Sequence, residues 1–197
     1  MKIKRIIGGS LESNCYIVSI KERGNCFIID PGYEAKNIIE EVRKAELNPQ
    51  GIILTHGHHD HIGAAAKVRD YFFCPIMIHS DDSFKLNFAP DKILEDGDTL
   101  ELDSETFVIQ STPGHTKGSI CIVATKSKVI FTGDTVFGDD LGRTDLPGGS
   151  EKDMKSTCRN VVDKWSNEFT IYPGHEEKAS MKHVRTHNEE FLNHISK

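Results

Sequence analysis

The sequence predicts a mixed α/β fold, of the α+β kind, in which two β-sheets pack together and helices cover their outer faces. Short apolar segments typical of strands occur in both halves of the chain, and segments with helical spacing lie between and after them. Each sheet must bury a face against another layer, so this order of elements favours a layered sandwich. No linker or low-complexity stretch interrupts it, so we expect residues 1–197 to form one domain.

The first half of the chain is expected to alternate strands with helices. Five apolar runs predict strands, at residues 3–7, 15–20, 26–30, 52–54 and 75–79. Pro31-Gly32 ends the third of these runs, and residues 34–47 then carry apolar side chains at helical spacing. The fourth run leads directly into a histidine-rich segment. Residues 62–72, which follow that segment, are also expected to be helical.

The second half begins with a polar stretch at residues 81–97, for which no element is expected. Five further strands are predicted, at residues 99–102, 107–110, 119–124, 129–132 and 169–172. Residues 151–165 have the pattern of a helix, and Ser150 is a suitable N-cap for it. Residues 176–195 are expected to be mostly helical. Strands therefore dominate both halves, as a fold with two sheets requires.

Composition and charge limit the classes of protein to consider. The net charge is −6 and hydrophobic residues make up 37% of the chain, as in an ordinary soluble protein. Because there is no basic face, no nucleic-acid partner is expected. The five cysteines include no CxxC pair, so we expect buried free thiols. No signal-peptide core or membrane-spanning run is present, so we expect a cytoplasmic protein without a membrane partner.

Four apolar runs end in a small turn that is followed at once by a side chain able to bind metal. These side chains are His56, His115, Asp134 and His175. A strand that stops in a glycine or proline turn presents the next side chain at the edge of its sheet, and we expect all four to share one edge. Rigid mounting of this kind is what a metal site requires.

Residues 56–61, with the sequence HGHHDH, are the densest group of such side chains. Alternate side chains of an extended turn face the same way, so His56, His58 and Asp60 are expected on one side. His59 is expected on the other side, and we predict that it is not a ligand. Asp60 begins a helical segment, where the helix dipole favours the ionised carboxylate.

These residues can be divided between two metal ions. The first set is His56, His58 and His115, and the second is Asp60, His61 and His175. Asp134 is expected to bridge the two ions. The expected cofactor is therefore two divalent metal ions, with zinc as the first choice, while iron and manganese also accept these ligands.

Other polar residues are candidates for supporting roles. Thr55, Thr112 and Thr132 lie at the expected rim and could steady the imidazoles. His79 follows a strand-like run and could line the site. The remaining histidines are expected to be surface or helix residues, namely His183, His187 and His194.

The ligand-bearing segments resemble those of the metallo-β-lactamase-fold superfamily over essentially the whole chain. The segments that carry this resemblance are HxHxDH at 56–61, TPGHTxGS at 112–119, FTGD at 131–134 and YPGH at 172–175. The resemblance implies an αββα four-layer sandwich with a binuclear metal site at one edge. Within the superfamily, the chain is most similar to compact glyoxalase II-like (hydroxyacylglutathione hydrolase-like) enzymes, as shown by GDTVF at 133–137, LGRTDLPGG at 141–149 and PGHE at 173–176.

Individual positions refine this resemblance. Classical β-lactamases of this fold generally lack the bridging aspartate, so Asp134 argues against that activity. Arg143 stands where the family has a basic residue near the substrate carboxylate, and we expect it to bind substrate, the alternative being a structural salt bridge. Glu177 replaces a tyrosine that tends to contact the thiol carrier. Long glyoxalase II enzymes have extra C-terminal helices, and we expect none here because too few residues follow His175.

The activity implied is hydrolysis of a small-molecule thioester, such as a hydroxyacylglutathione, by a hydroxide that bridges the two metals. Asp134 would bridge the ions, and Asp60 would be both a ligand and a hydrogen-bond partner that orients the hydroxide. A thiol has a pKa of about 8.5, so a thiolate can leave without a strong general acid. A thioester is therefore an easier substrate for this site than an amide.

Three other activities remain open on the same ligand set. A persulfide dioxygenase, which resembles this family, uses a single iron held by histidines and a carboxylate. A lactonase would direct the same hydroxide at an ester carbonyl. A phosphodiesterase also uses paired metals, but it usually needs a basic face that this acidic chain lacks. The sequence does not indicate the oligomeric state.

Overall fold

The structure, a computed structural model, describes residues 1–196 and contains two six-stranded β-sheets. In spatial order, the first sheet consists of β1 (Lys2–Gly8), β2 (Ser13–Ser19), β3 (Asn25–Ile29), β4 (Asn48–Ile53), β5 (Ile76–His79) and β6 (Lys92–Leu94). The second sheet consists of β12 (Ala179–Ser180), β11 (Thr170–Pro173), β10 (Val129–Gly133), β9 (Ile120–Ala124), β8 (Glu105–Ser111) and β7 (Thr99–Leu102).

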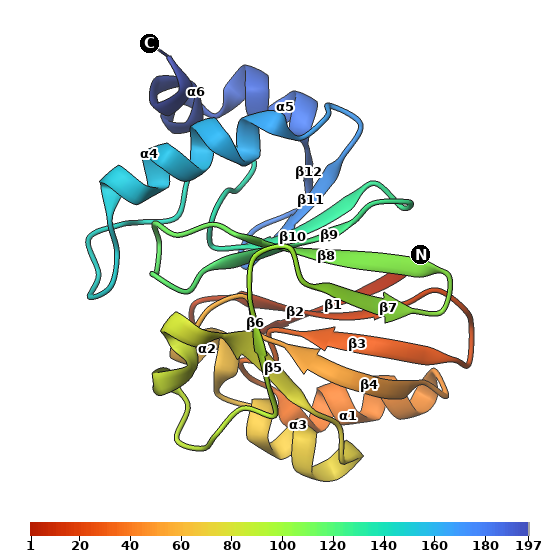
Figure 1. The fold of residues 1–197 in the computed structure, drawn as a ribbon. Coiled ribbons are helices and arrows are strands. Elements are labelled where there is room, and N and C mark those ends of the chain that lie inside the picture. Colours follow the sequence, from red (N-terminus) through yellow and green to blue (C-terminus); the bar gives the residue numbers. More distant parts are fainter. Residues whose placement is uncertain (197) are drawn as a thin grey trace.

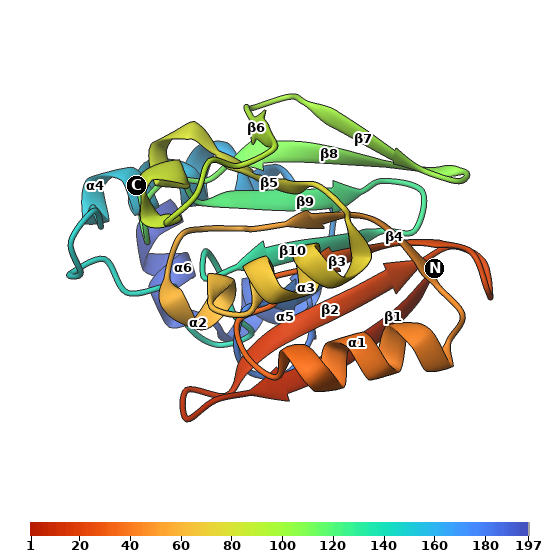
Figure 2. The same ribbon diagram turned by 90° about the horizontal axis from the view of Figure 1, so that it is seen from below.

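Helices cover the outer face of each sheet (Figure 1). The helices are α1 (Ala35–Lys44), α2 (His59–Ile62), α3 (Ala65–Phe72), α4 (Glu151–Asn160), α5 (Met181–His187) and α6 (Glu189–Ile195), with short 3-10 segments η1 (Ser80–Lys85) and η2 (Val162–Lys164). In Figure 2, α1 and α3 lie side by side in front of the first sheet, and α4, α5 and α6 lie behind the second. The predicted αββα four-layer sandwich is confirmed.

Three apolar clusters hold these four layers together. The first lies between the sheets, where Phe27 of the first sheet meets Phe107 of the second edge to face, with ring centroids 5.5 Å apart. The second lies between the first sheet and helices α1 and α3, and it includes Ile38 and Val68. The third lies between the second sheet and helices α4 to α6. Burial of apolar surface between layers is the main contribution to the stability of such a fold.

The differences from the expected elements have local causes. Strands β6 and β12 were not expected, because they contain only three and two residues and carry no clear alternation. The predicted helix at 62–72 is divided into α2 and α3. The predicted helix at 176–195 is divided at Asn188, whose Oδ1 accepts a hydrogen bond from Phe191 N and so caps α6. Ser150 caps α4 as expected, by accepting from Asp153 N.

Parallel pairing brings the site-bearing strand ends to one edge. Strands β3, β4 and β5 are parallel, and β10 and β11 are parallel in the other sheet. In Figure 1 the arrowheads of β3 and β4 point toward α2. Residues that directly follow these strands are therefore delivered to the same end of the sandwich. No helix in the described part of the chain is both long enough and apolar enough to cross a membrane.

Candidate metal centre

The seven predicted ligands lie together at this end of the sandwich. His56 follows β4, and His58 is the residue before α2, whose first turn contains Asp60 and His61. His115 follows β8, Asp134 directly follows β10, and His175 follows β11 by two residues. Only 4 residues form α2, so the two ligands in it are positioned by the turn itself. Side chains that are far apart in the sequence are thus brought together by the two sheets.

The first ligand group consists of His56, His58 and His115. One nitrogen from each ring lies within 4.8 Å of the others. His58 Nδ1 is 2.8 Å from His115 Nε2, and the rings of these two residues are nearly perpendicular at 86°. This arrangement directs three nitrogen lone pairs to a common point, as a metal ion requires.

The second ligand group consists of Asp60, His61 and His175. Asp60 Oδ2 lies 3.3 Å from the Nε2 atom of each histidine. The two Nε2 atoms are themselves 3.3 Å apart. This group therefore offers two nitrogens and one oxygen around a second point, which is the mixed donor set that zinc and iron both accept.

Asp134 lies between the two groups. Its Oδ2 atom is 3.5 Å from His115 Nε2 in the first group and 3.4 Å from His175 Nε2 in the second. Gly174 leaves room for this carboxylate, because a Cβ atom there would lie 2.1 Å from Asp134 Oδ1. One carboxylate therefore reaches both groups.

Two buried atoms of the site have no hydrogen-bond partner in the described chain, His56 Nε2 and Asp134 Oδ1. Buried polar atoms are almost always paired, because an unpaired one has lost its water without replacement. A divalent cation between these atoms would satisfy both of them at once. The residues present therefore fit a divalent metal.

The electrostatics of the site favour a cation. Burial would raise the pKa of Asp134, but the surrounding histidines outweigh this and lower it well below its ordinary value. The pKa of Asp60 is likewise lowered, because hydrogen bonds from His175 and His61 outweigh burial. Burial, with a contribution from His61, lowers the pKa of His56, so this ring is neutral and ready to bind metal.

Metal binding is expected to release protons. Burial tends to lower the pKa of His175, but hydrogen bonds to Asp134 and Asp60 outweigh it and raise this pKa to about 10 in the metal-free protein. The pKa of His61 is also raised well above its usual value by nearby carboxylates, despite burial. Both rings are therefore protonated at pH 7.5, whereas a metal requires the neutral imidazole.

Calorimetric titration of metal-free protein with zinc, at pH 7.5 in two buffers of different ionisation enthalpy, measures this release. We expect about two protons per chain. The number should fall as the pH approaches 10, where His175 loses its proton without metal. Equal heats in the two buffers would contradict the expected protonation.

Backbone carbonyls orient two of the imidazole rings. His115 Nδ1 donates to Arg143 O over 2.8 Å, and His175 Nδ1 donates to Leu11 O over 2.9 Å. Each bond turns the Nε2 atom of its ring toward the centre, where it can bind metal once it carries no proton. The histidines are thus held in the orientation required for metal before any metal binds.

Asp30 is a site residue that the sequence analysis missed. It is buried, and its Oδ1 accepts from Thr55 N over 2.7 Å while its Oδ2 accepts from Thr55 Oγ1 over 2.5 Å. Oδ2 also lies 3.2 Å from His61 Nδ1. A signal was available, because Asp30 follows an apolar strand and precedes Pro31-Gly32, the same pattern that marked the predicted ligands.

Asp82 is a second missed residue, and it joins three segments near the site. Its Oδ2 accepts from Gly57 N over 2.7 Å and from Thr116 Oγ1 over 2.8 Å, and its Oδ1 accepts from Gly118 N over 3.0 Å. The carboxylate therefore ties η1 to the loops that carry His56 and His115. Asp82 follows β5 by three residues but has no glycine or proline turn before it, so it lacks the pattern that marked the predicted ligands.

The supporting residues proposed from sequence are only partly near the ligands. Thr55 Oγ1 lies 3.1 Å from His56 Nδ1. Thr112 instead bonds Thr135, and Thr132 donates to Val136 O, so neither contacts an imidazole. The ring of His79 accepts from Asp81 N and caps η1. The helix residues His183 and His187 stack on each other away from the ligands.

His59 is exposed and does not join either ligand group. Its ring stacks on Tyr33, with an interplanar angle of 14°. We expect His59→Ala to retain the metal content and the activity of the wild type within about twofold, because the lost contact is a surface one. Metal analysis and steady-state kinetics test this, with His58→Ala as the contrasting variant that should lose metal. Loss of metal from His59→Ala would show that the loop faces the other way.

Arg143 lines the cavity above the ligands, but its charge is already compensated. Its Nε and Nη2 atoms donate to the two oxygens of Asp145 over 2.7 and 2.8 Å. Both side chains are mostly exposed, at 62% and 69%. The structure thus contains the salt bridge that the sequence left open as the alternative, and the backbone of Arg143 supports His115.

Comparison with known proteins agrees with this geometry. A family model of the metallo-beta-lactamase superfamily matches residues 8–175. The chain belongs to this superfamily. Its relatives include the hydroxyacylglutathione hydrolase GloC of Haemophilus influenzae, which is 32% identical over 98% of this chain and 99% of GloC. The superfamily match and hydrolase relatives identify a metal-dependent hydrolase.

Solved structures of the metallo-beta-lactamase superfamily share the fold closely. The BLEG-1 B3 metallo-beta-lactamase superposes with a TM-score of 0.92 at 28% identity, covering 96% of this chain and 99% of BLEG-1. TTHA1623 in a di-iron-bound form superposes with a TM-score of 0.80 at 26% identity, covering 94% of this chain and 98% of TTHA1623. The architecture is therefore shared over nearly the full length of these proteins.

Proposed function

We propose that the protein is a binuclear metallohydrolase that cleaves thioesters of small thiols. The observation that carries this proposal is the position of Asp134, whose carboxylate lies within 3.5 Å of a histidine from each ligand group. Zinc is the proposed metal, because histidine nitrogens and carboxylate oxygens are among its usual ligands in proteins. Iron is the alternative, since the similar TTHA1623 has a di-iron-bound form.

Two bound metal ions would supply an activated water at neutral pH and a Lewis acid for the substrate carbonyl. Asp60 lies on the cavity wall as an ionised carboxylate, so it can accept a hydrogen bond from that water and orient it. Leu11, Phe137 and Leu146 line the same cavity, whose volume is about 530 Å³. Their apolar surfaces exclude bulk water and strengthen polar interactions at the reacting carbonyl.

The lining of the cavity favours a thioester over an amide. Apart from the proposed ligands, the only ionisable side chains that line it within residues 1–196 are His59 and Arg143. Arg143 is held by Asp145 and, like every arginine, is a poor proton donor. The imidazole of His59, which stacks on Tyr33, is the one other ionisable group of this lining, so the cavity favours a leaving group that needs no strong acid, such as a thiolate. The relative GloC, a hydroxyacylglutathione hydrolase, supports the same choice.

The test is metal analysis followed by a comparison of substrates on the metal-loaded protein. We expect two metal ions per chain and a kcat/KM for S-lactoylglutathione about a hundredfold above that for a lactone or a β-lactam. The β-lactam is included because BLEG-1 is named a metallo-beta-lactamase. One iron per chain with oxygen uptake on a persulfide would overturn the proposal in favour of a dioxygenase. Faster β-lactam cleavage would overturn it in favour of a lactamase.

A further inference from the structure

Two hollows meet at the metal centre. The cavity above the ligands shares His58 and His59 with a second groove of about 520 Å³, which runs between α2, α3 and the segment after η1. A thioester also has two halves that meet at its scissile carbonyl. A carbonyl held beside His58 would therefore have one half in each hollow.

Lys85 is placed in this second groove by close packing. Its methylene stem lies over Gly57, the residue between His56 and His58, and a Cβ atom on Gly57 would lie 2.6 Å from Lys85 Cγ. Gly57 therefore gives the lysine its position. The contact fixes the path of the stem along the ligand loop, with the ammonium 5.2 Å from the centre of the Phe84 ring.

The segment that carries Lys85 is held firmly. Asp82, three residues earlier, is only 2% exposed and binds the backbone of Gly57 and Gly118 together with the Thr116 hydroxyl. Because these bonds join η1 to both ligand-bearing loops, Lys85 has a defined place relative to the metal centre. The backbone and the first part of the Lys85 stem are therefore already ordered before an anion binds.

The charge of Lys85 is uncompensated, unlike that of most cations near a hollow. It pairs with no carboxylate in residues 1–196, since Asp81 is bound by Lys117 and the Asp82 oxygens are occupied as described. Arg143, at the edge of the other hollow, is neutralised by Asp145.

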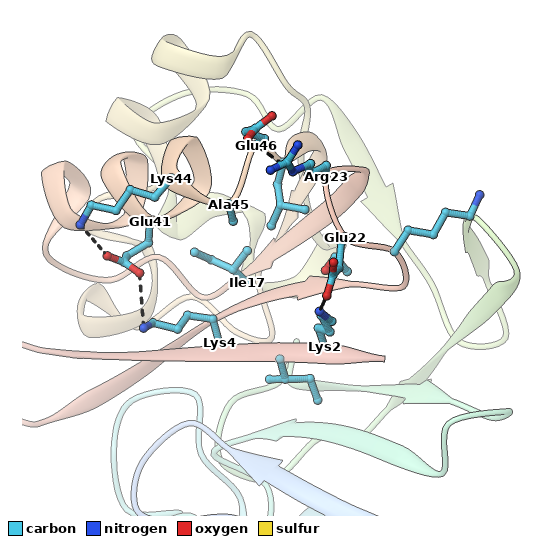
Figure 3. Close-up of a pocket in the computed structure, with 13 residues that line it drawn as sticks. Lys2, Lys4, Ile17, Glu22, Arg23, Glu41, Lys44, Ala45 and Glu46 are labelled. Carbon is cyan, nitrogen blue, oxygen red and sulfur yellow. Dashed lines mark hydrogen bonds and ion pairs between the residues drawn. The ribbon is translucent and has the colours of Figure 1, made fainter.

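A groove at the far edge of the first sheet shows the contrast (Figure 3). There, Lys4 and Lys44 both contact Glu41, and Arg23 contacts Glu46. Lys2 and Lys21, which also line that groove, pair with Glu22 and Asp103, so each of its cations has a carboxylate partner. Lys85 therefore differs from these lysines both in its place beside the metal centre and in its free charge.

The walls of the second groove are suited to an organic chain. Ile62, Leu86 and Phe88 are only partly buried, and each packs on the core while also lining the groove. Arg69 lies over the Phe88 ring at 4.4 Å and holds it in place. The volume of the groove lies in the range of ordinary ligand pockets. Its apolar walls, together with Lys85, therefore suit a substrate half that has an organic chain and a negative charge.

We propose that this groove binds the thiol half of the substrate, and that Lys85 binds a carboxylate at the end of that half. This inference rests on the proposed thioesterase function and specifies its substrate class as acyl esters of anionic thiols. Ile62 and Phe88 would contact the chain of the thiol, and the Lys85 ammonium would bind its charged end by a charge-assisted hydrogen bond.

The experiment compares two S-lactoyl esters on zinc-loaded protein. One has glutathione as its thiol, which carries carboxylates, and the other has N-acetylcysteamine, which carries no charge. We expect Lys85→Met to raise the KM for the glutathione ester about tenfold relative to that for the neutral ester. Lys85→Arg should restore most of the difference. Lys67→Met, on α3 and outside the groove, is the matched control and should leave the ratio of the two KM values unchanged.

Two outcomes would overturn the inference while the thioesterase function stands. One is a KM ratio in Lys85→Met within twofold of the wild type, and the other is an equal rise in KM for both esters. If the wild type cleaves neither ester, the proposed function fails separately. Binding of glutathione itself, measured by calorimetry on wild type, Lys85→Met and Lys67→Met, then tests whether the groove binds the thiol. Tenfold weaker binding in Lys85→Met alone supports it, and equal binding in all three overturns it.

Discussion

Asp134→Ala is expected to lose bound metal and to reduce kcat/KM for the thioester by at least about a thousandfold. The physical reason is that this carboxylate lies between the two ligand groups, 3.5 Å from His115 Nε2 and 3.4 Å from His175 Nε2. Without it, the five histidines have Asp60 as the one remaining carboxylate among the proposed ligands. Metal content by mass spectrometry and steady-state kinetics at saturating zinc measure the two effects.

Two further variants make this result specific. Asp134→Asn keeps the shape of the side chain but loses its charge, and it should also lose most of the metal. Asp70→Ala removes a carboxylate that is 68% exposed and lies outside the site, so it should keep both metal and activity. Full metal content and normal activity in Asp134→Ala would show that the two groups work without a bridge and would contradict the binuclear site.

Asp30→Ala is expected to destabilise the protein by about 3 kcal/mol and to weaken metal binding 10- to 100-fold. The change leaves the buried Thr55 N–H and the Nδ1 atom of His61 without their acceptor. It also places alanine at a backbone φ of 50°, a conformation that aspartate and asparagine tolerate better than alanine does. Urea unfolding of the metal-free protein and zinc titration measure the two effects separately.

Asp30→Asn is the matched control for this prediction. It keeps the left-handed backbone and one oxygen for Thr55 N, so its loss of stability should be well below that of Asp30→Ala. Its neutral amide no longer supplies the negative charge that makes the His61 imidazole a stronger metal ligand, so the weaker metal binding should remain. Equal stability of the wild type and Asp30→Ala would show that water replaces the carboxylate.

The order of elements was largely readable from the sequence. Runs such as 119–124 and 129–132 carry mostly apolar side chains, because both faces of these strands are covered, and they became β9 and β10. The shortest strands were missed. β12 contains two residues and exists only because Ala179 pairs with Ile171 of β11. Pairing of this kind depends on a partner strand and leaves no periodic signal of its own.

The supporting residues of the site show the same limit. Asp82 lies in a polar stretch and acts through contacts with Gly57, Thr116 and Gly118, which are 25 to 36 residues away. Arg143 has the residue type of a substrate anchor, but Asp145 holds its guanidinium. Neither outcome is visible in local spacing, since each depends on which side chains the fold brings into reach.

The sequence by itself determined the layered fold and the seven residues proposed to hold metal. Strand-then-turn patterns and the HGHHDH segment are local features, and the direction of each side chain in them follows from the backbone conformation. The tertiary structure alone decided which groups support those residues and which lysine lies beside the ligand loop. A hydrogen bond or an ion pair forms only between atoms brought within about 3–4 Å. Sheet pairing and layer packing set those distances for Asp30, Asp82 and Lys85.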